Sequence, residues 1–395
     1  MPAPPAASLT SFLKLLGLLW LAGMTMRITI LAAPPVLPLI HADLHMTETQ
    51  VGLLIGLPLV VFALCAVPGS LFVARFGAPL TMLVGMLITA LAGAGRGGAN
   101  SVWLLYAATL AMGFGVAIMQ PALPTLVRAW APQRIGLATA VSTNGMLVGV
   151  TLGPALTIPV LLPLIDQSWR LEFVLWAAPV LVTALLFILL SPPTHRDTKT
   201  SGGSAQQWWP DWRSPLIWLL GLTFGSNNAL YYGANAFLPD YLTSMGRADL
   251  IGSALGWLNG AQLVASFVLL AIAGQLQRRA WPYLVFGPLA LAGLLGVVLA
   301  DGHWIVLAAG VVGFSTAVTF VMTLALPPIL SPPDDVHRMA GGMFTISYSC
   351  AVIVPIFCGA LWDLTGMPWT AFVPLGLCAL TLTALGFALS RHRPR

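Results

Sequence analysis

Long apolar runs follow one another along almost the whole chain of 395 residues. A membrane-spanning helix needs roughly 20 apolar residues, and twelve such runs with short connections account for nearly all of the sequence. With 58% hydrophobic and 7% charged residues, a soluble domain of this size could not keep its surface in water. The sequence therefore predicts an all-α polytopic membrane protein with twelve transmembrane helices. The spans are expected near 12–40, 51–73, 79–96, 102–127, 136–163, 170–190, 215–241, 250–274, 281–300, 304–328, 340–362 and 367–390.

The longest polar stretch, residues 191–214, is rich in Ser, Gly and Pro and reads as a cytoplasmic linker. It divides the chain into an N-terminal six-helix half, 1–190, and a C-terminal six-helix half, 215–395. The halves share landmarks in the same order, which predicts a pseudo-symmetric parallel duplication. Leu37-Pro38 precedes Val51-Gly52 as Leu238-Pro239 precedes Ile251-Gly252, and Arg75 and Arg279 each end a span.

Lys and Arg are distributed unequally between the two sets of loops. With a cytoplasmic N-terminus, thirteen of these residues lie on the cytoplasmic side, and the outer loops hold Arg96, Arg170 and Arg247. This bias predicts a multi-pass protein of a bacterial inner membrane with both termini in the cytoplasm. No basic run precedes the first apolar stretch, so we expect this stretch to be kept as the first helix and not cleaved as a signal peptide.

The charges and cysteines exclude several other functions. The net charge of +5 is scattered over the loops and does not form the basic face of a nucleic-acid-binding protein. The four cysteines lie in apolar stretches without metal-ligand spacing, so neither a metal site nor a disulfide is expected, and no cofactor is implied. The expected partners are the lipid bilayer and a small-molecule substrate, and the protein is expected to be a monomer.

Short motifs resemble those of the major facilitator superfamily. The loop after the second span contains Arg75 and Gly77, as in the superfamily's pattern Gly-x-Leu-x-Asp-Arg-x-Gly-Arg-Arg, but the acidic position is Ala74. The second half keeps Arg279 at the matching place and again lacks the acid. Residues 149–154 resemble the Gly-x-x-x-Gly-Pro motif, which the superfamily associates mainly with antiporters and exporters. It comprises Gly149, Gly153 and Pro154.

Further residues narrow the resemblance to the cyanate and 2-nitroimidazole porter branch. They are an arginine in the first span, Leu230-Tyr231-Tyr232, Ala236–Pro239, and Asn259 with Gln262. The resemblance implies two six-helix halves that rock about a central substrate site. It also implies that Arg75, Gly77, Arg279, Gly149, Gly153 and Pro154 belong to gating or family motifs, although the missing acid puts a charge-relay gate in doubt.

Arg27 lies near the middle of the first span, too deep for its side chain to reach water easily. An arginine at this depth costs about 2.5–3.5 kcal/mol on insertion scales, so a compensating group is expected. All twelve Asp and Glu residues fall in loops or at span ends, which leaves Arg27 as the only charge assigned to mid-membrane. An anionic or strongly dipolar substrate could supply the counter-charge. The alternative is a structural arginine bonded to carbonyl groups freed by Pro34, Pro35 and Pro38.

Polar side chains within the spans indicate which helices face the cavity. Asn228, Tyr231, Tyr232 and Asn235 recur at helical spacing on the seventh span, and Asn228 occupies the position that the duplication pairs with Arg27. Hydrogen bonds between packed helices are the alternative reading. The remaining candidate substrate-binding residues are Asn259, Gln262, Gln120, Asn144 and Tyr348.

These residues indicate a secondary transporter of a small anionic or polar solute, and not an enzyme. The candidate solutes are a cyanate-like anion, a small carboxylate or a nitro-heterocycle, with Arg27 as the anion-binding residue. The sequence places no Asp, Glu or His in the core. This favours a uniporter, an exchanger, or co-transport in which the substrate carries the proton. Multidrug-type efflux of apolar compounds is a second hypothesis, and a membrane receptor or enzyme is a third.

Overall fold

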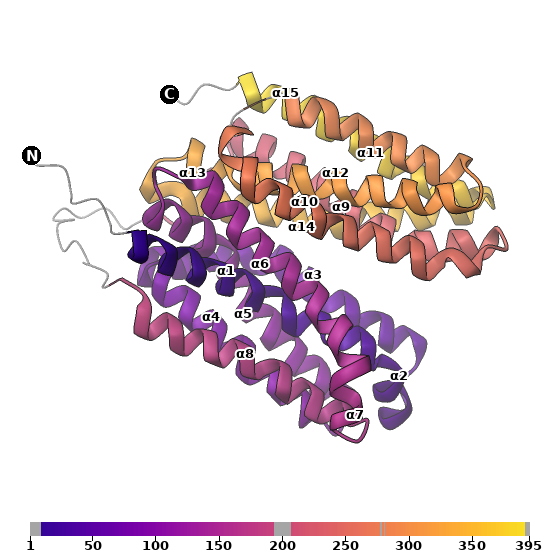
Figure 1. The fold of residues 1–395 in the computed structure, drawn as a ribbon, viewed down its shortest axis with the longest axis horizontal. Coiled ribbons are helices and arrows are strands. Elements are labelled where there is room, and N and C mark those ends of the chain that lie inside the picture. Colours follow the sequence, from indigo (N-terminus) through magenta and orange to yellow (C-terminus); the bar gives the residue numbers. More distant parts are fainter. Residues whose placement is uncertain (1–8, 193–206, 277–278, 280, 392–395) are drawn as a thin grey trace, which may run out of the picture.

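The computed structural model describes residues 9–192, 207–276, 279 and 281–391, and within them every regular element is helical. The helices form two bundles that lie side by side (Figure 1). Helices α1 to α8 make the first bundle and helices α9 to α15 make the second. Helix α1 begins and helix α15 ends at the same end of the molecule, as an even number of spans requires.

The long helices follow the apolar runs closely. The first bundle contains α1 (Leu9–Leu31), α2 (Ala33–Leu44), α3 (Glu48–Phe76), α4 (Ala78–Gly97), α5 (Val102–Trp130), α6 (Ile135–Leu156), α7 (Leu162–Leu164) and α8 (Trp169–Leu190). The second contains α9 (Pro215–Ser244), α10 (Ile251–Leu276), α11 (Trp281–Leu299), α12 (His303–Leu324), α13 (Leu326–Leu330), α14 (Val336–Thr365) and α15 (Val373–Arg391). The fold class predicted from the sequence is confirmed.

Within the described residues, 11 helical segments are long and apolar enough to cross a membrane. Helix α9 is the expected span that is missing from this set, although its 30 residues are more than long enough. Its amides and tyrosines lower its mean hydropathy. These side chains face other helices and not lipid, because Asn227 and Asn228 are buried.

Three expected spans are interrupted. The span at 12–40 is two helices that meet at Ala32, and Pro34 stands in the first turn of α2. The span at 136–163 changes at Thr157 from α6 into a π-helical turn, Thr157–Leu161. The span at 304–328 breaks at Ala325, just before the prolines of α13. Proline lacks a backbone N–H and clashes with the preceding turn, so it favours such breaks, although other helices, α3 among them, continue through prolines.

The two bundles are joined tightly at one end. There, Arg128 at the end of α5 donates a hydrogen bond of 2.6 Å to the Pro328 carbonyl of α13. Ser70 of α3 donates one of 2.7 Å to the Trp208 carbonyl, and Arg338 of α14 donates one of 2.9 Å to the Trp209 carbonyl. Residues 207–214 of the expected linker thus pack against both bundles, while its residues 193–206 lie outside the described residues.

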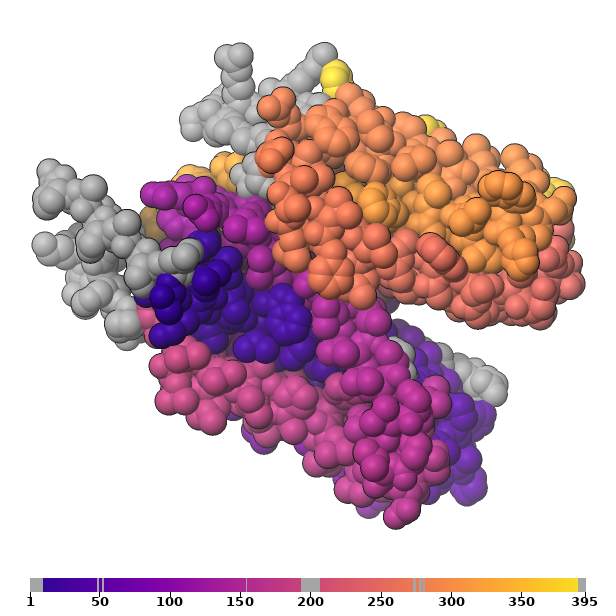
Figure 2. All heavy atoms as spheres, in the orientation of Figure 1, coloured from indigo at the N-terminus to yellow at the C-terminus, as the bar shows by residue number. Residues whose placement is uncertain are grey.

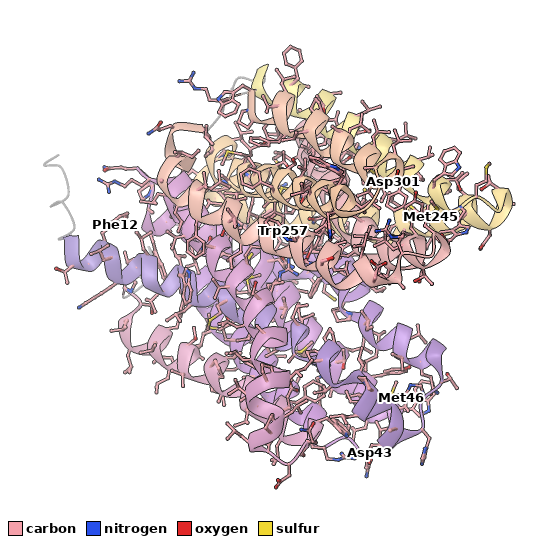
Figure 3. The ribbon with its side chains drawn as sticks, turned by 45° about the vertical axis from the view of Figure 1, so that its right-hand side comes forward. Phe12, Asp43, Met46, Met245, Trp257 and Asp301 are labelled. Atoms are coloured by element: carbon pink, nitrogen blue, oxygen red, sulfur yellow. The ribbon has the colours of Figure 1, made fainter. Side chains whose placement is uncertain are left out.

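At the opposite end the bundles diverge. The space-filling view shows a wedge-shaped opening between them (Figure 2). Asp43 and Met46 lie at this end of the first bundle, and Met245 and Asp301 lie at the same end of the second, whereas Phe12 marks the closed end (Figure 3). The opening therefore lies at the end of the molecule that carries Met46 and Met245.

Candidate functional site

Close packing between α1 and α6 places Arg27. A Cβ atom added to Gly149 would stand 2.5 Å from the Met24 carbonyl oxygen, and one added to Gly153 would stand 3.1 Å from that of Leu31. Both glycines of the predicted motif therefore lie where α6 touches the α1 backbone, with Pro154 next to them in α6. Small residues allow helices to approach this closely in a membrane. The contact holds the Arg27 turn of α1 beside the centre of the molecule.

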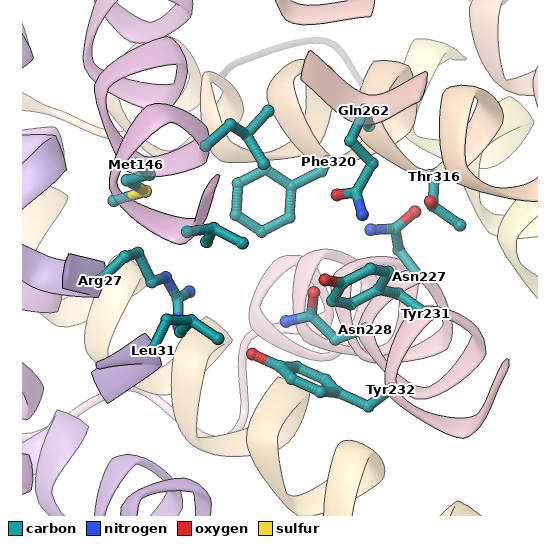
Figure 4. A pocket seen from close by; sticks show the side chains of 13 residues that line it. Arg27, Leu31, Met146, Asn227, Asn228, Tyr231, Tyr232, Gln262, Thr316 and Phe320 are labelled. Atoms are coloured by element: carbon teal, nitrogen blue, oxygen red, sulfur yellow. The ribbon is translucent and has the colours of Figure 1, made fainter. Parts of the chain in front are cut away.

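Arg27 opens onto a cavity of about 100 Å³ between the two bundles. Helices α1 and α6 of the first bundle and α9, α10 and α12 of the second form its wall (Figure 4). Its polar side carries Arg27, Asn227, Asn228, Tyr231, Tyr232, Gln262 and Thr316. Its apolar side carries Leu31, Met146, Leu147, Val150, Ala317 and Phe320. The cavity can thus receive a solute with one polar edge and one apolar face.

The Arg27 guanidinium is held by neutral groups. It is 9% exposed, and its Nη2 donates a hydrogen bond of 3.1 Å to the Tyr348 hydroxyl of α14. Gln120 of α5 donates a second hydrogen bond, of 2.9 Å, to the same hydroxyl. Among the described residues no carboxylate forms an ion pair with Arg27. A buried cation therefore faces the cavity with much of its hydrogen-bonding capacity available to an anion.

The amides of α9 are fixed by bonds to neighbouring helices. Asn228 donates to the Ser347 hydroxyl of α14 at 2.8 Å, and Asn227 accepts from the Thr319 hydroxyl of α12 at 2.6 Å. Amides that are already anchored in this way keep their orientation when a ligand enters. The side of the cavity opposite Arg27 is therefore preorganised.

A second group of bonds lies one turn further along α9. The Tyr231 hydroxyl donates to Asn259 Oδ1 at 2.7 Å, and Asn259 Nδ2 donates to Asn235 Oδ1 at 3.0 Å. Asn235 in turn donates to the Tyr231 carbonyl at 2.9 Å. Asn235 and Asn259 therefore stand behind the cavity wall and orient Tyr231.

The candidate binding residues fall into three groups. Arg27, Asn228, Tyr231, Tyr232 and Gln262 line the cavity. Tyr348, Asn235 and Asn259 lie behind it, each one hydrogen bond away from a lining residue. Gln120 lies one step further back, because it is bonded to the Tyr348 hydroxyl.

Asn144 lies apart from the cavity. It accepts from the Trp20 indole at 2.8 Å and donates to Ser266 at 2.9 Å, so it joins α1, α6 and α10. Asn227 and Phe320 also line the cavity, although neither was among the candidate substrate-binding residues. Asn227 is an amide within an expected span, and this polarity is the signal that identifies it.

The loop-motif residues lie at the closed end. Arg75 is exposed at the end of α3, and Gly77 joins α3 to α4 with φ of 85°. Only glycine adopts this backbone conformation without strain. Arg279 lies between α10 and α11, next to residues 277, 278 and 280, which are outside the described residues. Among the described side chains, no carboxylate pairs with Arg75.

The structure corrects the expectation that Arg27 is the only charge in the core. Arg96 is 1% exposed and Glu172 is 0% exposed, and both lie inside the first bundle. The sequence analysis placed Arg96 in an outer loop and Glu172 at a span end. Both do lie at helix ends, α4 for Arg96 and the first turn of α8 for Glu172, but their side chains turn inward between packed helices. Hydropathy along the chain does not report this direction.

Comparison with known proteins agrees with this architecture. A model of the Major Facilitator Superfamily matches residues 19–355. The uncharacterized transporter YycB of Bacillus subtilis is 26% identical, with 100% of this chain and 97% of that protein covered. The 2-nitroimidazole transporter of Escherichia coli is also 26% identical, over 96% of this chain and 95% of its own length. The cyanate transport protein CynX of Escherichia coli is 26% identical, over 95% and 97%.

Solved structures show the same fold. The transporter FucP in its outward conformation superposes with a TM-score of 0.78 at 15% identity, covering 97% of this chain and 100% of that one. The human organic anion transporter MFSD10 gives 0.74 at 16% identity, covering 98% and 100%. These relatives are membrane transporters and not enzymes. The chain belongs to the major facilitator superfamily and is a multi-pass secondary transporter of that family.

Proposed function

We propose that this transporter moves a small anionic or polar solute by alternating access, with Arg27 as the anion-binding residue. The solute classes are a cyanate-like anion, a small carboxylate and a nitro-heterocycle. The observation that carries the proposal is a buried arginine on the cavity wall with no carboxylate partner among the described residues. A buried unpaired charge is unfavourable. An anion that paired with the Arg27 guanidinium would therefore be bound strongly.

The size and the two-sided wall of the cavity support a small solute. One ordered water needs at least 10–15 Å³ of such space, so a cavity of about 100 Å³ holds several waters or a solute of a few heavy atoms. The amides and phenols can orient a polar edge, and the apolar side around Phe320 can cover a flat ring. Three relatives carry names of matching chemistry: transporters of 2-nitroimidazole, of cyanate and, as a probable function, of sulfoacetate.

The transport cycle rests on the two halves, 1–190 and 215–395, joined by 191–214. If the protein lies in an inner membrane with both termini on the cytoplasmic side, the closed end is cytoplasmic and the opening faces outward. Rocking of one half against the other would expose the same cavity to the cytoplasm. In this scheme Arg75, Gly77 and Arg279 act in the cytoplasmic loops of the gate. Gly149 and Gly153, which precede Pro154 in the motif, hold α6 against the helix that carries Arg27.

Thermal unfolding of the purified protein in detergent, with and without candidate solutes, tests the proposal. A ligand that binds only the folded state at 100 times its Kd stabilises it by about 2.7 kcal/mol. We expect cyanate, sulfoacetate or 2-nitroimidazole to raise the melting temperature of the wild type and to have no effect on Arg27→Ala. The control Arg213→Ala removes an exposed arginine outside the cavity and should retain the response. An equal response in Arg27→Ala would refute the assigned role.

Multidrug-type efflux remains a second candidate because the cavity has an apolar side. An apolar substrate would interact with Phe320 and Met146 and would not need Arg27. Stabilisation by a lipophilic dye, equal in wild type and Arg27→Ala and absent in Phe320→Ala, would support this candidate against anion transport.

A further inference from the structure

Two buried ionisable side chains, Arg96 and Glu172, lie inside the first bundle, away from the solute cavity. Arg96 of α4 donates a hydrogen bond of 3.0 Å to the Thr29 carbonyl of α1. Its guanidinium also contacts Met112 Sδ at 3.5 Å, and its Cζ atom lies 4.0 Å from the centre of the Phe173 ring. None of these direct contacts is an anion. Arg96 thus keeps its positive charge among carbonyl, sulfur and aromatic groups.

The Glu172 carboxyl group on the neighbouring helix α8 has even fewer groups around it that would stabilise a charge. Its Oε1 accepts one hydrogen bond of 3.2 Å from the Thr157 hydroxyl, which itself accepts from the Trp176 indole at 2.8 Å. Its Oε2 is buried without a hydrogen-bond partner in the described part of the chain. No ion pair within 4.0 Å involves Glu172 among these residues. A fully buried carboxylate with one neutral donor is unfavourable, whereas a protonated carboxyl group is not.

The other charged groups around α8 do not change this conclusion. Helix α8 packs against α4, α1 and α2, whose titratable and charged side chains, apart from Arg96, are Lys14 and Arg27 on α1 and His41 and Asp43 on α2. Asp43 pairs with Arg170 of α8 at 2.7 Å near the surface, and Arg27 bonds to Tyr348. Arg96 contacts α8 at Phe173, the residue next to Glu172.

We propose that Glu172 is a proton-binding site of this transporter, in which the carboxyl group holds a proton in the outward-open structure and shares its site with the buried Arg96. Proton binding forms one O–H bond on the carboxylate and takes the proton from water, with no change of oxidation state. With the proton bound, the pair carries a net charge of +1, and without it the pair is neutral. The site therefore switches the charge buried within the first bundle.

The location connects this charge to the solute cavity. Arg96 is bonded to the carbonyl of Thr29, which lies two residues after Arg27 on α1. Thr157, the donor to Glu172, begins the π-helical turn that follows α6, and such turns occur frequently at functional sites. Proton release would strengthen the attraction of Glu172 for Arg96 and so act on the helix that carries Arg27. This coupling rests on the proposed transport function, whereas proton binding itself does not. Proton-coupled transport would take the place of the uniport or exchange that the sequence analysis favoured when it placed no acid in the core.

Infrared spectroscopy of the purified transporter in lipid tests the site without any transported solute. We expect the wild type at neutral pH to show the carbonyl stretch of a protonated carboxyl group, and Glu172→Gln to lose the intensity of one such group. Asp43→Asn is the matched control, because it removes a half-exposed, ion-paired carboxylate and should reduce only the carboxylate bands. A Glu172→Gln spectrum that keeps the protonated band and loses carboxylate intensity would overturn the proposal.

A second variant covers the case in which Glu172→Gln does not fold. Thr157→Val removes the hydroxyl bonded to Oε1 and should shift the frequency of the protonated band. An unshifted band would assign it to another carboxyl group and refute the site. Neither measurement uses a solute, so the infrared result does not depend on whether Arg27 binds an anion.

Discussion

The Tyr348 hydroxyl is the group through which Arg27 and Gln120 of the first bundle meet the second bundle. Tyr348→Phe removes this acceptor and keeps the ring, which packs 5.1 Å from Phe62 and 6.0 Å from Phe344 between ring centroids. Two buried donors then lose their partner. Each unsatisfied donor costs about 1–3 kcal/mol, and water in the cavity can solvate part of Arg27. We therefore expect a loss of roughly 2–4 kcal/mol.

Unfolding by SDS titration, followed by tryptophan fluorescence, measures this loss. The matched control is Tyr283→Phe, since Tyr283 is also buried and its hydroxyl has a single neutral contact, 3.3 Å from that of Thr323. Its loss should be about 1 kcal/mol. Equal destabilisation of the two variants would refute the claim that the Tyr348 hydroxyl supports a charged donor.

The same variant makes an opposite prediction for binding. A bound anion competes with the Tyr348 hydroxyl for Arg27, so removing the hydroxyl should tighten binding of an anion such as cyanate by up to about tenfold, which is about 1.4 kcal/mol. Isothermal titration of wild type and variant gives the ratio. Weaker binding by Tyr348→Phe would show that the hydroxyl contacts the anion directly, and the competition model would be wrong.

Three further substitutions probe the framework of the site, with thermal unfolding as the readout. Gly149→Leu should prevent accumulation of folded protein, because the leucine side chain would overlap the α1 backbone. The control Gly17→Ala adds a Cβ with no atom within 4 Å, so it should be neutral or stabilise the protein by up to about 1 kcal/mol. Gly77→Ala should cost about 1–2 kcal/mol because φ is 85°, and an unchanged melting temperature would contradict that strain. Asn144→Leu leaves the half-buried Trp20 indole without its acceptor, while the Ser266 hydroxyl keeps its bond to the Leu263 carbonyl, and it should cost about 1–3 kcal/mol in total. Retained stability would show that this bridge between the bundles is dispensable.

The helical framework could be read from the sequence because the bilayer imposes it. A span must be apolar and about 20 residues long whatever its neighbours are. The expected spans 79–96 and 170–190 therefore differ by one residue from α4 and α8. Breaks inside a span were harder to place, since proline marks them but the neighbouring helices decide whether the chain bends, as at Ala32, or forms a π-helical turn, as at Thr157.

Polarity within a span located part of the candidate site for the same reason. Arg27 and Asn228 had to avoid lipid, and the structure places both on the cavity wall. The pattern could not distinguish a residue that lines the cavity from one that links packed helices. Asn144 is as polar and as buried as Asn228, yet it joins three helices away from the cavity. The partner of a polar side chain comes from a distant segment, as Tyr348 does for Arg27 across 321 residues.

By itself, the amino-acid sequence determined the membrane environment and the helical framework, and it predicted the duplication and the depth of Arg27, since each follows from hydropathy or from the order of residues along the chain. Tertiary structure alone decided which side chains meet. It turned Arg96 and Glu172 inward from helix ends that look like ordinary membrane boundaries. The physical reason is that burial of a charge depends on the surfaces packed around it, and those surfaces come from helices that the sequence does not place beside one another.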